Sequence, residues 1–187
     1  MLLGFLIFII ILAGRKWKSF RRSFIVFIAG FQGMVLEIIL LLNYQMHNGI
    51  LFQNIGILIM GFMLGLTLGA WMVNKVIKNY TGVLLITLSI IIYLLLGVLL
   101  SSGNIHTFLI ALIVLVISGF LTSGLFAFAC IFNVEDQNKI ISPLYSSDLL
   151  GGVVGSLLAN LIFIPVLGFA TTAQFMAFPS LLLLFFL

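Results

Sequence analysis

The sequence predicts an all-α protein, a polytopic bundle of about seven transmembrane helices that forms a single domain over residues 1–187. Three observations predict this class. Hydrophobic residues make up 64% of the chain and charged residues only 6%, whereas soluble domains carry roughly 25% charged residues. The apolar residues occur in long runs rather than in alternation, which is typical of membrane helices. The polar stretches between the runs are too short to form a soluble domain.

Seven apolar segments follow one another along the chain, at residues 2–13, 24–44, 52–74, 81–101, 105–132, 145–168 and 170–187. A helix needs about 20 residues to cross a bilayer, so the first segment is short and the number of spans falls to six if it does not cross. Its basic residues follow the apolar run, whereas a signal peptide has them before it. We therefore expect a retained anchor or a shortened first span.

The distribution of positive charge supports this division of the chain. All the basic residues fall in the loops after the first, third and fifth segments: Arg15, Lys16, Lys18, Arg21, Arg22, Lys75, Lys78 and Lys139. The positive-inside rule makes these loops cytoplasmic. The sequence thus predicts a multi-pass protein of a bacterial cytoplasmic (inner) membrane, with its N-terminus outside and its C-terminus inside. The lipid bilayer is its first partner, and no nucleic-acid binding is expected because no basic patch lies beside exposed aromatics.

Glycines recur at helical spacing in the third and sixth segments. They are Gly61, Gly65 and Gly69 in one and Gly151, Gly152 and Gly155 in the other. Small residues on one face let helix backbones approach closely in lipid. The pattern predicts tight helix packing, with these two segments at the centre of the bundle. The spacing leaves open a second interpretation, in which the bare backbone forms a groove for a ligand or a partner helix.

Two carboxylates fall inside predicted spans. Glu37 lies roughly 10 Å below the outer end of its helix at Tyr44, and it is either a protonated structural acid or a site for a cation or a proton. Asp148 is expected about one turn from the inner surface, at the start of a helix after Pro143. There it would cap free N–H groups and favour the positive end of the helix dipole. The different depths predict that the two acids do not touch.

Other polar residues give weaker signals. Gln45 shares a helix face with Glu37, and with nearby amides and His47 it either lines an outer vestibule or reflects ordinary loop polarity. Tyr145 stands beside Asp148 at the depth where tyrosines anchor spans. The histidines lie in separate loops and the chain has one cysteine, so we expect no metal site and no cofactor. No catalytic set of serine, histidine and acid can be placed together.

Several separated motifs occur in residues 24–168. Gly30, Met34 and Glu37 form a G-x-x-x-M-x-x-E pattern, and "FMLGLTLG" begins at Phe62. The other motifs are Gln45, Gly49, "GFLTSGLF" from Gly119, and the set Tyr145, Asp148, Gly151 or Gly152, Gly155, Pro165 and Gly168. Together these motifs resemble the membrane region of bacterial spermidine-synthase-like integral membrane proteins. In that family the region is commonly joined to a soluble aminopropyltransferase domain, and this chain shows none.

The resemblance implies a membrane module, and three functions remain open. The first is a non-catalytic membrane subunit or scaffold that docks other membrane or membrane-associated subunits through its glycine-rich helices. The second is a small permease-like binder or transporter of organic cations such as polyamines, with Glu37, Gln45, Asp148 and Tyr145 as candidate ligand-binding residues. The third is the detached membrane domain of an aminopropyltransferase. The chain alone is expected to be no enzyme, and catalysis would need a separate soluble part.

Overall fold

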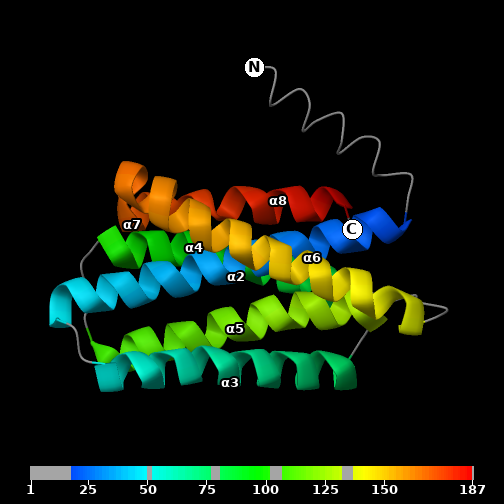
Figure 1. Ribbon diagram of the computed structural model, residues 1–187, viewed down its shortest axis with the longest axis horizontal. Coiled ribbons are helices and arrows are strands. Elements are labelled where there is room, and N and C mark those ends of the chain that lie inside the picture. The colour runs from blue at the N-terminus through cyan, green and yellow to red at the C-terminus, as the bar shows by residue number, and fades with distance from the viewer. Residues whose placement is uncertain (1–17, 50–51, 77–80, 102–106, 132–136, 187) are drawn as a thin grey trace, which may run out of the picture.

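The computed structural model describes residues 18–49, 52–76, 81–101, 107–131 and 137–186, and these residues are helical almost throughout (Figure 1). No strand occurs among them. The elements are α2 (Lys18–Asn48), α3 (Phe52–Val76), α4 (Thr81–Ser101), α5 (Phe108–Ile131), α6 (Gln137–Leu158), the π-helical turn η1 (Ala159–Phe163), α7 (Ile164–Phe175) and α8 (Ala177–Phe186).

Five helical stretches are long and apolar enough to cross a membrane, fewer than the seven that the sequence predicts. The protein is thus an all-α, multi-pass membrane protein by length and composition. The first predicted segment, 2–13, lies outside the described residues. The sixth and most of the seventh fall within one continuous stretch of 41 residues, Ile141–Leu181, because no polar loop separates them. As a straight helix this stretch would be about 60 Å long, twice the thickness of the hydrocarbon core.

That last stretch is not straight, because the chain turns back within α7. Pro165 lacks an N–H and disturbs the hydrogen bonds of the preceding turn, which is the π-helical η1. Gly168 then adopts φ 78° and ψ 174°, a conformation open to glycine and strained for other residues. The Thr172 hydroxyl donates to the carbonyl oxygens of Gly168 at 2.6 Å and Phe163 at 3.1 Å. After this turn α8 returns beside α4 (Figure 1).

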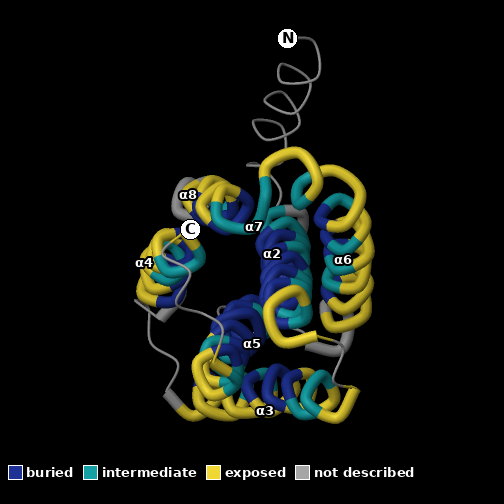
Figure 2. Tube along the Cα trace, turned by 90° about the vertical axis from the view of Figure 1, so that its left-hand side faces the viewer, coloured by how far each residue is buried: buried dark blue, intermediate teal, exposed yellow. Residues whose placement is uncertain are grey.

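The helices form pairs around two central members, α2 and α5 (Figure 2). α3 packs against α5, α6 packs against α2, and α4 packs against α7 and α8. Buried residues make up 61% and 50% of the apolar windows of α2 and α5, but only 28% of the window in α3 and 11% in Ile141–Leu181. The prediction that the third and sixth segments are central is therefore wrong. Glycines allow one close neighbour, and they do not determine how many neighbours a helix has.

The basic residues of the described helices gather at one end of the bundle, where α2 and α6 begin and α3 ends (Figure 1). Arg21 and Arg22 lie near the start of α2, and Lys75 lies in the last turn of α3. The Lys75 ammonium sits 5.3 Å from the centre of the exposed Trp71 ring. An exposed tryptophan with a neighbouring lysine is typical of a membrane–water interface. The predicted positions Arg15, Lys16 and Lys78 lie outside the described residues.

Candidate functional site

The glycines of α3 bring its backbone against that of α5. A Cβ atom at Gly65 would lie against the Val116 carbonyl oxygen, 2.9 Å from the Val116 carbonyl carbon and 3.0 Å from the Phe120 nitrogen. At Gly69 it would meet the Phe120 carbonyl, and at Gly61 a methyl group of Leu112. Only a residue without a side chain fits at Gly65 and Gly69, because the opposing atoms there include main-chain atoms that cannot rotate away.

The glycines of α6 bring its backbone against that of α2 in the same way. Cβ atoms at Gly151 and Gly155 would meet the carbonyl groups of Phe27 and Phe31. Gly152 faces a different direction, and its Cβ would have only Met34 within 4 Å, at 3.2 Å. The two glycine faces therefore belong to two separate helix pairs, α3–α5 and α2–α6.

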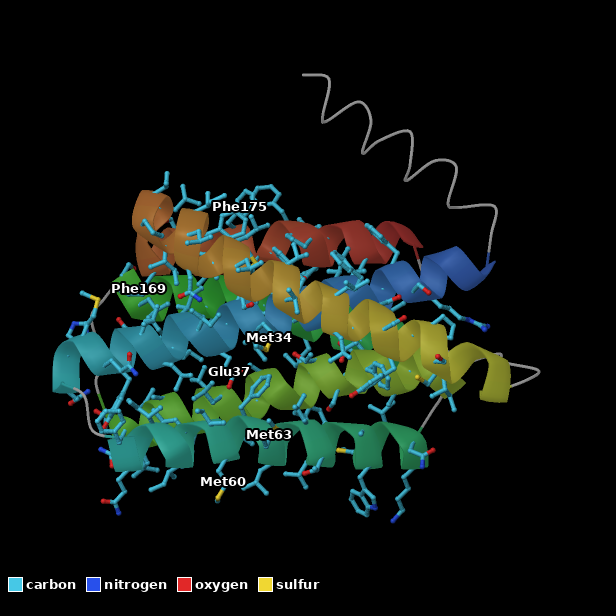
Figure 3. The ribbon with its side chains drawn as sticks, viewed as in Figure 1. Met34, Glu37, Met60, Met63, Phe169 and Phe175 are labelled. Atoms are coloured by element: carbon cyan, nitrogen blue, oxygen red, sulfur yellow. The ribbon has the colours of Figure 1, made fainter. Side chains whose placement is uncertain are left out.

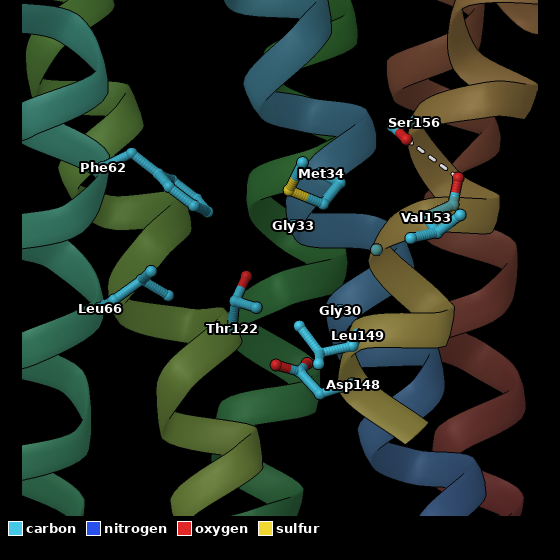
Figure 4. Close-up of a pocket in the computed structure, with 11 residues that line it drawn as sticks. Gly30, Gly33, Met34, Phe62, Leu66, Thr122, Asp148, Leu149, Val153 and Ser156 are labelled. Carbon is cyan, nitrogen blue, oxygen red and sulfur yellow. Dashed lines mark hydrogen bonds between the residues drawn. The ribbon is translucent and has the colours of Figure 1, made fainter. Parts of the chain in front are cut away.

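A cleft lies between these two pairs. Its volume is about 260 Å³, with α2 and α5 behind it and α3 and α6 on either side (Figure 4). Its lining is formed by Gly30, Gly33, Met34, Phe62, Leu66, Thr122, Asp148, Leu149, Gly152, Val153 and Ser156. Asp148 is the one charged residue in this lining. The rest of the lining is mainly apolar, so the Asp148 carboxylate is the group in the cleft that could bind a cation.

Asp148 is not a helix cap, which corrects the expectation from its sequence neighbours. α6 begins at Gln137 and carries Pro143 inside it, so Asp148 lies about three turns from the start of α6, roughly 16 Å along the axis. A proline in the second turn removes one backbone donor and does not prevent the helix from starting earlier. The sequence had placed Asp148 about one turn inside the membrane surface. In the structure it lies about two turns inside the apolar stretch that begins at Ile141.

The Asp148 side chain reaches the cleft across the bare backbone of Gly30. A Cβ at Gly30 would lie 2.5 Å from both the Oδ1 and the carbonyl oxygen of Asp148. Figure 4 shows the carboxylate and the Thr122 side chain facing the same space. The Thr122 hydroxyl donates to the Ser118 carbonyl oxygen at 2.9 Å. Within the described part of the chain, no side chain or main-chain N–H donates to the Asp148 carboxylate, and no ion pair forms with it.

Glu37 lies on the same face of α2 as the glycines of the cleft. It follows Gly30 by about two turns, roughly 10 Å, and projects toward α5 and α3 in the view of Figure 3. Its side chain is 9% exposed, and none of the described residues makes a hydrogen bond or an ion pair with it. Glu37 does not line the cleft. It is a separate, buried acid on α2, whereas Asp148 belongs to α6 and is half-buried.

The other two candidates lie apart from both acids. Tyr145 is 57% exposed and outside the cleft lining, so it joins neither carboxylate. Gln45 is half-buried near the end of α2, where its carbonyl oxygen accepts from the N–H of Gly49 at 2.9 Å. Close to that end, Asn54 of α3 donates to the Tyr44 hydroxyl at 2.7 Å. This hydrogen bond links the ends of α2 and α3.

The structure adds residues that the sequence interpretation did not select. Thr122, in "GFLTSGLF", lines the cleft, and its side chain lies opposite Gly33 of α2. Gln32 is fully buried, and its amide donates to the Met176 carbonyl oxygen at 2.8 Å and to the Ser180 hydroxyl at 2.9 Å. The Tyr93 hydroxyl donates to Gln32 Oε1 at 3.4 Å. Gln32 could have been selected from the sequence, because a glutamine within an apolar run needs hydrogen-bond partners. Here those partners come from α4 and from the α7–α8 region.

Among the residues that the structure describes, no three histidine, cysteine, aspartate or glutamate side chains come together in a group that could hold a metal ion. Comparison of the chain with protein-family models, with curated proteins and with solved structures finds no match.

Proposed function

We propose that this chain is a permease-like membrane protein that binds a small organic cation in the cleft between α3 and α6. The proposal includes the topology inferred from charge: the end that carries Arg21, Arg22 and Lys75 faces the cytoplasm, as the positive-inside rule predicts. On this topology α2 and α6 run outward from the cytoplasmic side. Asp148 binds the cationic group, and the apolar lining contacts the rest of the ligand.

The observation that carries the proposal is the Asp148 carboxylate, which faces an apolar cleft without a hydrogen-bond donor among the described residues. A charged side chain inside a membrane helix is costly, up to about 2.5–3.5 kcal/mol at the middle of the helix on insertion scales, and such residues usually pair or mark a ligand path. The same position could have held an alanine at no such cost. A cation supplies both the opposite charge and the hydrogen-bond donors that the carboxylate lacks.

The size and charge of the cleft restrict the ligand. Sites for drug-sized molecules occupy roughly 300–1,000 Å³, so about 260 Å³ accommodates an ammonium group with a short apolar portion, or one part of a longer molecule. No lysine or arginine lines the cleft, and an anion would meet the Asp148 carboxylate. A primary or substituted amine fits both conditions, and polyamines belong to this class.

Equilibrium binding of amines to the protein in phospholipid nanodiscs tests the proposal. We expect saturable binding of at least one amine, weakened about 10-fold to 100-fold by Asp148→Asn, because a hydrogen bond to a charged group contributes about 1.5–3 kcal/mol. Asparagine keeps the size of the side chain and removes the charge. Ser146→Ala, at an exposed position on the same helix, is the matched control and should leave binding unchanged. Equal binding by wild type and Asp148→Asn would refute the proposal.

Transport requires a second measurement, on liposomes that contain the same variants. Uptake of the bound amine by the wild type, and its loss in Asp148→Asn, would extend the proposal from binding to permeation. Glu37→Gln belongs in this assay because Glu37 is buried further along α2 without a hydrogen-bond partner among the described residues. If a cation or a proton moves along α2 past Glu37, this variant should reduce uptake and leave equilibrium binding at Asp148 intact.

A non-catalytic subunit is the rival proposal, and the exposed face of α3 is the observation that favours it. Met60, Met63 and Leu64 are exposed on that helix, and methionines adapt readily to partner surfaces. The glycine faces pack within the chain, so docking would fall to this outer face. A detached aminopropyltransferase domain is one form of the same proposal. Purification of the native complex distinguishes a docking subunit from a cation-binding permease. A stoichiometric partner, soluble or membrane-bound, would favour the docking subunit.

A further inference from the structure

The cleft opens through the side of the bundle, between two helices that do not pack against each other. α3 packs on α5 and α6 packs on α2, so α3 and α6 lie on the outside of the bundle, each beside its own partner (Figure 2). The lining of the cleft includes residues of both helices. Leu149 and Val153 line the cleft on α6, and they are also 52% and 55% exposed. Residues that are both lining and exposed mark the mouth, which therefore lies along the helices and not at their ends.

The mouth falls within the apolar part of both helices. Asp148 and Ser156 mark the length of the cleft along α6, about two turns or roughly 12 Å. Both lie inside the stretch that is long and apolar enough to cross a membrane, and the same holds for Phe62 and Leu66 on α3. If these apolar stretches cross the bilayer as proposed above, this mouth faces hydrocarbon and not water.

A mouth of this kind favours a particular class of ligand. A small hydrophilic amine would have to leave water and cross hydrocarbon before it reached Asp148, and the transfer of a bare charge into such a medium is strongly unfavourable. An amphiphilic amine already resides in the bilayer. Its chain can stay in hydrocarbon or lie along the apolar walls while its head group moves to the carboxylate.

We propose that the cleft takes its ligand sideways from the bilayer, and that the ligand is a single-chain amphiphile with a primary ammonium head. The head lies against Asp148, where the bare backbone of Gly30 leaves room for the carboxylate. The chain leaves between Leu66 of α3 and Val153 of α6, which line opposite sides of the cleft. This inference rests on the proposed function and specifies the substrate class of the same site.

Three probes separate the head from the chain: dodecylamine, butylamine and dodecanol. Binding is measured on the protein in phosphatidylcholine nanodiscs, and each affinity is expressed per mole of probe dissolved in the bilayer. Dodecylamine should bind at a saturable single site. Butylamine, which has the head alone, should bind at least 10-fold more weakly. Dodecanol, which has the chain alone, should show no saturable binding that depends on Asp148.

Two substitutions at adjacent positions test the mouth. Val153→Trp places a large side chain at the mouth, and Val154→Trp places the same side chain at an exposed position outside the cleft lining. Dodecylamine binding should fall about 10-fold or more in Val153→Trp and change less than about twofold in Val154→Trp. Leu149→Trp is a second mouth variant in case Val153→Trp does not fold. Asp148→Asn should abolish the preference for dodecylamine over dodecanol.

The outcomes distinguish this inference from the function on which it rests. If butylamine binds as tightly as dodecylamine and the mouth variants leave both unchanged, access from the bilayer is refuted while cation binding at Asp148 stands. If no amine shows binding that depends on Asp148, both are refuted. If dodecanol and dodecylamine bind equally in wild type and in Asp148→Asn, the cleft holds neutral hydrocarbon, and the assignment of an ammonium ligand is overturned.

Discussion

Replacement of Gly65 by alanine should separate α3 from α5. The new Cβ would lie 2.9 Å from the Val116 carbonyl carbon and 3.0 Å from the Phe120 nitrogen, whereas ordinary contacts of this kind lie near 3.5–4.0 Å. The opposing atoms belong to the α5 backbone, so no side-chain rotation relieves the overlap. α3 must move outward by about 0.5–1 Å, and it has few other contacts in the bundle that could compensate.

The expected magnitude follows from two opposing effects. Overpacking of this kind destabilises by about 1–3 kcal/mol, and alanine gains up to about 1 kcal/mol over glycine in a helix interior. Gly56→Ala, in the same helix, is the matched control because nothing lies within 4 Å of its Cβ position. The helix propensity cancels in the comparison, so Gly65→Ala should be less stable than Gly56→Ala by about 1–3 kcal/mol.

Reversible unfolding with sodium dodecyl sulfate in mild-detergent micelles gives this difference. Trp71 lies on α3 and its fluorescence reports the release of that helix. If the two variants unfold at the same detergent fraction, the close approach of α3 and α5 is not a source of stability. The account of Gly61 and Gly69 as contact positions on the same face would then fail with it.

Three further substitutions test other parts of the structure. Gln32→Leu should lower the free energy of unfolding by about 1–3 kcal/mol in the same assay, because it leaves the buried Tyr93 hydroxyl without an acceptor. Unchanged stability would show that this contact is dispensable. Gly168→Ala should destabilise by about 1–2 kcal/mol, because φ is 78° there, and a fully stable variant would contradict the chain reversal. Gly30→Ala should weaken amine binding by displacing Asp148, whose Oδ1 would lie 2.5 Å from the new Cβ; wild-type affinity in nanodiscs would contradict that placement.

The candidate site could be predicted only in part. The sequence singled out Asp148 and Glu37 because an acid in an apolar run is conspicuous whatever the fold. It misjudged the place of Asp148 within its helix, because Pro143 suggested a helix start, whereas α6 begins earlier, at Gln137. Thr122 was not selected at all. A hydroxyl within a span has many ordinary uses, and only its place opposite Gly33 brings it to the cleft.

The sequence by itself determined that the chain is all-α, that its helices are apolar enough to cross a membrane, and that the basic residues collect at one end. Each of these properties depends on local composition, which hydropathy and charge reveal directly. Only the tertiary structure decided which helices are neighbours. Gly65 packs on α5 and Gly151 on α2, although the spacing of glycines is the same in both helices. The hydrophobic effect does not rank such pairings in lipid, because a lipid tail is as apolar as a leucine. The choice depends on the fit of whole helix surfaces, and the cleft at Asp148 is the space that this choice leaves open.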